Sequence, residues 1–121
     1  MMQYGQRSTA ATPRMPVDRS TLDGQWVVLV ANDGELAAAD ADGRVPVMAL
    51  AGNEQRYLLV FRNAAKARQF VASQDLVGAE PRMVVRGNRD ELVRIARAAS
   101  VVGVLVDYEP ETQQYFAVTD L

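Results

Sequence analysis

The chain has 121 residues, a length that suits one domain, and a formal net charge of −2. Hydrophobic residues make up 49% of it and charged residues 23%, as in an ordinary globular protein. It contains no cysteine and no histidine. These two absences exclude a disulfide framework, a thiol nucleophile and a zinc site built on thiolate or imidazole, so neither a catalytic triad nor a zinc hydrolase is expected.

Residues 1–20 predict a flexible N-terminal arm, followed by a single domain over residues 21–121. Ser8, Thr12 and Pro13 interrupt any hydrophobic period in the arm, and it has few large apolar residues that could dock. It also lacks the apolar core of a signal peptide, and the chain has no run of about 18 apolar residues for a membrane span. We therefore expect a cytoplasmic protein that makes no membrane contact.

Three strands joined by short turns are predicted after the arm. Gln25–Ala31 is rich in β-branched residues and predicts a strand buried on both faces, and Val45–Ala51 and Gln55–Phe61 predict two more. Glu35–Asp40 predicts a weak additional strand. Because Pro46 has no N–H to donate, it should lie at the start of its strand or on an edge.

Two helices are predicted in the second half of the chain. Asn63 is a suitable N-cap for the first, whose buried face contains Ala67 and Phe70. The second is the clearest helix and covers residues 88–100, with Asn88 as N-cap and Glu91 completing a capping box. Its apolar stripe consists of Leu92, Ile95, Ala96 and Ala99.

Shorter strands are predicted around these helices, at residues 82–87, 101–108 and 113–121. The order is then roughly β-β-β-α-β-α-β-β. This order predicts an α+β (mixed α/β) fold in one domain, with a mixed, mostly antiparallel sheet of about five to six strands and two helices packed on it.

The strand-to-helix junction within Arg56–Val71 contains a candidate binding site. Arg62, Asn63, Lys66 and Arg68 lie around the N-terminus of the first helix, where free N–H groups and a partial positive charge attract anions. These residues could contact an anion or a partner. No glycine-rich phosphate loop precedes the helix, however, so we favour the alternative of a solvated helix face.

The other candidates have ordinary structural readings. Gly87 beside Asn88 reads as a turn glycine followed by an N-cap. The acidic residues at 33–42 do not have the spacing of a calcium loop and predict polar hairpin turns, so no metal or cofactor site is expected. Asp107, Glu109 and Glu111 predict a solvated surface that faces the basic helices. The aromatic residues are too scattered to indicate a base-stacking platform.

Three short motifs carry a family resemblance. They are "DGR" at residues 42–44, "AAKARQF" at 64–70 and the glycine-containing strand "VVGVLVDYEP" at 101–110. With their order along the chain, they make the segment from Trp26 to Phe116 resemble the SseB (enhanced serine sensitivity) family, in particular its N-terminal domain. The resemblance implies an α/β domain of poorly defined molecular role, and it supplies no catalytic residues to carry over to this sequence.

These observations lead us to expect a non-catalytic binding or protein-interaction domain of a cytosolic bacterial protein, with another protein as its partner. A small enzyme using carboxylate and arginine chemistry is one alternative. A nucleic-acid or anion binder is another, because segment 61–100 has eight basic and four acidic residues, although the overall negative charge argues against general nucleic-acid affinity. A deep pocket with paired acids would favour the enzyme. A continuous arginine face would favour nucleic-acid binding, and an exposed apolar patch would favour a protein partner.

Overall fold

The computed structural model describes residues 19–52 and 54–120. Residues 1–18 of the predicted arm lie outside this range. The described chain begins with a short 3-10 helix, η1 (Arg19–Leu22), and Leu22 is buried in the core. The first described element therefore already contributes to the core.

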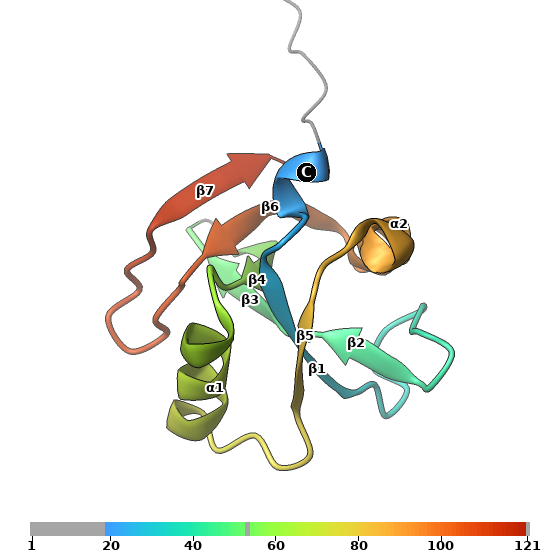
Figure 1. Ribbon diagram of the computed structural model, residues 1–121, viewed down its shortest axis with the longest axis horizontal. Coiled ribbons are helices and arrows are strands. Elements are labelled where there is room, and N and C mark those ends of the chain that lie inside the picture. The colour runs from blue at the N-terminus through green and yellow to red at the C-terminus, as the bar shows by residue number, and fades with distance from the viewer. Residues whose placement is uncertain (1–18, 53, 121) are drawn as a thin grey trace, which may run out of the picture.

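The described residues form seven strands and two α-helices, which confirms the predicted α+β class and, with one additional strand, the predicted order (Figure 1). The strands alternate with the helices only in the second half of the chain. The elements are β1 (Trp26–Ala31), β2 (Arg44–Pro46), β3 (Met48–Ala51), β4 (Gln55–Val60), α1 (Ala64–Ser73), β5 (Glu80–Met83), α2 (Arg86–Ala98), β6 (Val101–Val106) and β7 (Ala117–Asp120).

These strands form two sheets, where a single sheet was predicted. One has the order β2-β1-β5 and is antiparallel. The other has the order β3-β4-β6-β7, in which β4 and β6 are parallel and the other pairs antiparallel. The sheets meet where Trp26 and Phe61 exchange two backbone hydrogen bonds of 2.7 Å. The junction therefore brings β1 beside β4 without merging the sheets.

The predicted strand Val45–Ala51 is divided at Val47. Its first part, β2, pairs with β1, and its second part, β3, pairs with β4. The N–H of Val47 donates to the carbonyl of Val28 (2.9 Å), and its own carbonyl accepts from the N–H of Leu59 (3.2 Å). The chain therefore passes from one sheet to the other at this residue. Pro46 lies on the edge strand β2, which confirms its predicted edge position.

The predicted weak strand Glu35–Asp40 is absent, because local side-chain bonds hold this segment in an irregular loop. The Asn32 side chain accepts a hydrogen bond from the N–H of Leu36 (2.8 Å) and donates one to its carbonyl (3.0 Å). Asp40 in turn accepts from the N–H of Arg44 (2.8 Å). Such side-chain bonds compete with a strand ladder for the backbone.

Strands β1, β4 and β6 bury side chains on both faces. In β1, Val27 and Leu29 belong to the core under α2, whereas Val28 between them belongs to the core under α1. Successive residues of a strand point to opposite faces, so one apolar run supplies both cores. Figure 1 shows the two helices on opposite sides of these strands. This confirms the prediction that the first strand is buried on both faces.

The two helices begin in different ways. Asn63 is the N-cap of α1, as predicted, and its side chain accepts from the N–H of Lys66 (2.9 Å). In α2 the predicted N-cap was wrong, because the helix begins earlier, at Arg86. Asn88 is inside its first turn, where the side-chain oxygen accepts from the N–H of Val85 (2.8 Å). Gly87 is consequently helical and does not form the predicted turn.

Candidate functional site

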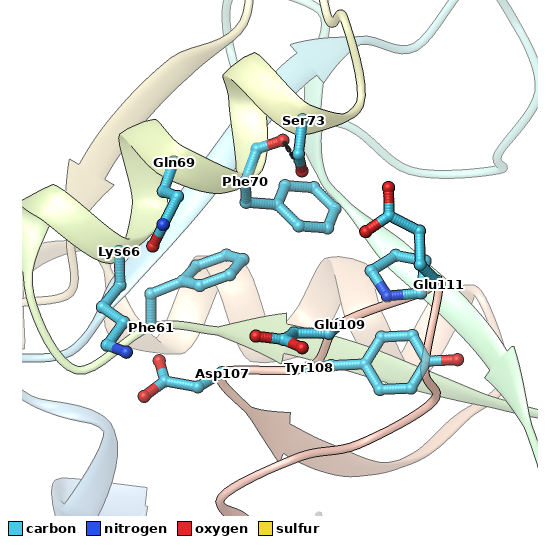
Figure 2. A pocket seen from close by; sticks show the side chains of 10 residues that line it. Phe61, Lys66, Gln69, Phe70, Ser73, Asp107, Tyr108, Glu109 and Glu111 are labelled. Atoms are coloured by element: carbon cyan, nitrogen blue, oxygen red, sulfur yellow. Dashed lines mark hydrogen bonds between the residues drawn. The ribbon is translucent and has the colours of Figure 1, made fainter.

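A pocket of about 190 Å³ lies between α1 and the segment that follows β6 (Figure 2). Aromatic side chains form its inner surface, and polar and charged side chains surround its opening. The pocket is lined by Phe61, Lys66, Gln69, Phe70, Ser73, Asp107, Tyr108, Glu109, Pro110 and Glu111.

The parallel pairing of β4 and β6 brings these residues together. Val60 and Val106 pair at the ends of the two strands, so the residues that follow leave the sheet at the same edge. The N–H of Asp107 donates to the carbonyl of Val60 (2.9 Å). Asp107 has a left-handed backbone (φ 56°), which turns the chain and leads the next residues along α1. The carboxyl ends of parallel strands are a common place for binding sites.

Arg62 holds Asp107, one of the residues that line the pocket, in place. Its Nε lies 2.5 Å from Oδ2 of Asp107, and its backbone N–H donates to Oδ1 of the same carboxylate (3.1 Å). The guanidinium carbon also lies 3.7 Å from the centre of the Phe116 ring. A cation in this position is attracted by the ring face. Arg62 is therefore occupied in holding the end of β6 against the start of β7.

The four residues of the predicted anion or partner site have separate roles. Arg62 pairs with Asp107, and the Asn63 side chain caps the helix. Lys66 lines the pocket and makes no ion pair within 4.0 Å in the described part of the chain. Arg68 is exposed on α1 and does not line the pocket. Of the four, the structure thus brings only Lys66 to the pocket.

The acidic residues after β6 lie where the sequence placed them, opposite a basic helix. Asp107, Glu109 and Glu111 line the pocket across from α1. Glu109 and Glu111 are exposed, but the Asp107 side chain is only 9% exposed and Tyr108 is buried. The prediction of a solvated surface is therefore correct for two of the three acids and wrong for Asp107.

Sequence reasoning missed the aromatic part of the pocket. Phe61 and Phe70 pack with their ring centres 5.1 Å apart at an angle of 46°, and Tyr108 lies in the same core. Phe61 and Phe70 are close in the sequence, but Tyr108 is far from both and joins them only through the parallel pairing of β4 with β6. The sequence contained one signal that could have revealed Tyr108, which stands between the acidic residues Asp107 and Glu109. Such alternation indicates a strand-like segment with one face inward.

A second charged cluster spans the smaller sheet. Glu80 on β5 forms ion pairs with Arg82 (2.5 Å) and with Arg44, which reaches it from β2 on the other side of β1. Hydrogen bonds from Arg82 and Arg44 lower the pKa of the Glu80 carboxyl. The cluster joins three strands and does not line the pocket described above, which indicates a structural role.

The basic residues of segment 61–100 do not form one continuous face. Lys66 and Arg68 are on α1, whereas Arg86, Arg94 and Arg97 are on α2. Because the two helices cover opposite faces of the strands (Figure 1), these two groups lie on opposite sides of the fold. The arrangement lacks the single basic stripe that is typical of nucleic-acid binding.

No group of three or more acidic residues among residues 19–52 and 54–120 is placed to hold a metal ion. Over the same range, no helix is long and apolar enough to cross a membrane. Neither a scan of the sequence against protein-family models nor a search of curated proteins returns a match.

Proposed function

We propose that this chain is a non-catalytic protein-interaction domain of a cytosolic bacterial protein. The observation that carries the proposal is a strip of two exposed apolar side chains, Phe116 and Val118, at the edge strand β7. Their exposed fractions are 63% and 51%. We call this pair the β7 strip. Adjacent large apolar side chains that remain exposed on a folded domain are a common mark of a protein contact.

The β7 strip continues the apolar face of the larger sheet. Val118 lies directly opposite Leu105, so the two side chains share a face. Leu105 is buried in the core under α1, whereas Val118 lies at the sheet edge and stays half exposed. A partner that covers Val118 and Phe116 would therefore extend a packing surface that the domain already uses.

Among the strands of the described residues, β7 has a neighbour on one side only, β6. The edge strands of the smaller sheet, β2 and β5, contain Pro46 and Pro81, which remove a hydrogen-bond donor from each. β7 has the sequence AVTD, with no proline and no lysine. Proline and lysine are common protections of a sheet edge, so β7 is well suited to accept an extended segment of a partner.

The alternatives have less support. An enzyme of the kind considered needs paired acids inside a deep pocket, but Asp107 is paired with Arg62, and Glu109 and Glu111 are exposed to solvent. A nucleic-acid binder needs one basic surface, and the basic residues are divided between two faces. The resemblance to the SseB family remains a prediction, and it agrees with a domain that binds without catalysis.

The test compares one variant with one matched control. Phe116→Ser combined with Val118→Ser removes the β7 strip, whereas Val77→Ser removes a residue that is 95% exposed in the loop between α1 and β5. Figure 1 places that loop far from β7. Proteins captured from the native host would be identified by mass spectrometry, purified, and titrated by calorimetry.

We expect the wild type and the Val77 variant to bind the same purified partner equally, and the double variant to bind at least about tenfold more weakly. Thermal unfolding of all three proteins checks that the double variant is folded. Equal affinity of a folded double variant would rule out the strip as the interface. Failure of the wild type to bind any purified candidate would contradict the interaction proposal itself.

A further inference from the structure

The pocket between α1 and the segment after β6 combines an aromatic interior with an acidic opening. Phe61, Phe70 and Tyr108 supply aromatic rings to it. Its volume of about 190 Å³ exceeds that of an engineered 150 Å³ cavity known to hold benzene. A small flat or compact group fits such a space, and the face of an aromatic ring attracts positive charge.

The charged groups at the opening are unequal in number. Asp107, Glu109 and Glu111 supply three carboxylates, against the one ammonium group of Lys66. Asp107 is already paired with Arg62. Glu109 accepts a hydrogen bond from the hydroxyl of Thr112 (3.2 Å), which brings no charge. In the described part of the chain, neither Glu109 nor Glu111 forms an ion pair within 4.0 Å.

The lysine and the most distant unpaired carboxylate lie at opposite ends of the pocket. In Figure 2, Lys66 lies toward the end that contains Asp107, and Glu111 lies at the other end, near Phe70. Glu109 lies between these ends, beside Phe61 and Tyr108 in the same view. The end with the free carboxylates is therefore also bordered by aromatic rings.

A neighbouring contact shows that this part of the fold can hold a guanidinium group. Arg62 places its guanidinium carbon 3.7 Å from the centre of the Phe116 ring and its Nε 2.5 Å from Asp107. An aromatic face and a carboxylate thus act together on one cation. The pocket offers the same two kinds of group, and the one ammonium group among its lining residues, that of Lys66, lies toward Asp107.

We propose that this pocket binds an organic cation, a guanidinium or alkylammonium group, between its aromatic rings and the carboxylates of Glu109 and Glu111. The group can belong to a basic peptide side chain or to a free amine. The proposal concerns a different surface from the β7 strip and does not depend on it. It also reverses the sign of the ligand expected near Lys66, because the carboxylates outnumber the one lysine.

The first experiment is a titration of the isotope-labelled full chain, followed by amide NMR shifts. The probes are ethylguanidinium, tetramethylammonium, and a Gly-Ser peptide with one central arginine, and inorganic phosphate tests the opposite sign. We expect the cations to cause saturable shifts in residues 61–73 and 107–111, and phosphate to cause none. Stronger binding of the peptide would identify a side chain as the ligand, and equal or stronger binding of the small cations would identify a free amine. Either result supports the pocket.

Variants then test the charge. Glu109→Gln combined with Glu111→Gln keeps the shape of both side chains and should weaken cation binding about three- to tenfold, as expected for the loss of two exposed charge contacts. Lys66→Met removes the competing ammonium group and should strengthen it. Arg68→Met is the matched control, because Arg68 is on the same helix but does not line the pocket, and it should change affinity less than Lys66→Met does.

Three results would overturn the proposal. If none of the cations causes a saturable shift, the pocket does not bind organic cations. Saturable phosphate shifts that Lys66→Met abolishes show an anion site. Equal cation affinity of the wild type and the doubly neutralised variant, with both proteins folded by thermal unfolding, shows that the carboxylates do not recognise the cation.

Discussion

At the scale of single residues, Arg62 shows why the task of a charged side chain is hard to predict from its neighbours in the sequence. Its position before the N-cap Asn63 suggested an anion site, because basic residues at a helix N-terminus attract anions. In the structure its side chain points to Asp107 and Phe116, which lie 45 and 54 positions further along the chain. A contact of such sequence separation depends on strand pairing, which no local pattern specifies.

Gly103 on β6 carries the sharpest prediction at this scale. A Cβ atom at this position would lie 2.7 Å from the backbone oxygen of Thr119 and 3.2 Å from the Tyr57 ring. Because a backbone atom of β7 cannot move without disturbing the pairing of the two strands, Gly103→Ala should lower the free energy of unfolding by about 1–3 kcal/mol. Urea unfolding followed by circular dichroism measures the change.

Gly87 in the first turn of α2 is the matched control for that substitution. A Cβ atom there would meet nothing within 4 Å. Gly87→Ala should therefore leave the free energy of unfolding unchanged or raise it by up to about 1 kcal/mol, because alanine has the higher helix propensity. If Gly103→Ala were as mild as Gly87→Ala, the close packing of β6 against β7 would be disproved.

At the scale of elements, the sequence was most informative where a local rule decides the structure. The period of α2 correctly placed Leu92 and Ile95 in the core, and both are buried. Its start was misplaced, because an asparagine can satisfy helix N–H groups from the N-cap or reach back from the third helical position. Asn88 does the second. Asparagine occurs at the N-cap and at the third helical position alike, so the sequence pattern alone could not tell which of the two positions Asn88 occupies.

The N-cap of α1 is testable by two substitutions. The Asn63 side chain accepts from the N–H of Lys66 at 2.9 Å. Asn63→Ala removes this acceptor and should lower the free energy of unfolding by about 1 kcal/mol, whereas Asn63→Asp should keep most of it because aspartate caps equally well. Chemical denaturation of the three proteins checks the order. Equal losses in both variants would mean that Asn63 acts through something other than its side-chain oxygen.

At the scale of the whole molecule, the sequence predicted the class and the element order but not the division into two sheets. The run Val45–Ala51 is uniformly apolar, and Pro46 predicts an edge position but not the change of sheet at Val47. The pocket was missed for the same reason, since it forms only where β4 and β6 end together. The acids and the lysine of the site had already been singled out from the sequence. Its aromatic residues could be recognised as part of the site only from the topology.

The last prediction follows from the sharing of strands between two cores. β1 places Val27 and Leu29 in the core under α2 and Val28 in the core under α1, so neither core can be lost without disturbing the other. Ile95 on α2 is fully buried, and Ile95→Ala should lower the free energy of unfolding by about 2–5 kcal/mol. Trp26, the single tryptophan of the chain, packs against the other core and reports on it by fluorescence. In the variant, the fluorescence and circular dichroism transitions should move together to the same lower midpoint, as in a two-state domain.

The control is Arg97→Ala on the same helix. Because the Arg97 side chain is exposed, this substitution should leave the free energy of unfolding within about 0.5 kcal/mol of the wild-type value. A dichroism midpoint that falls while the Trp26 transition stays at its wild-type position would show that the two cores unfold independently.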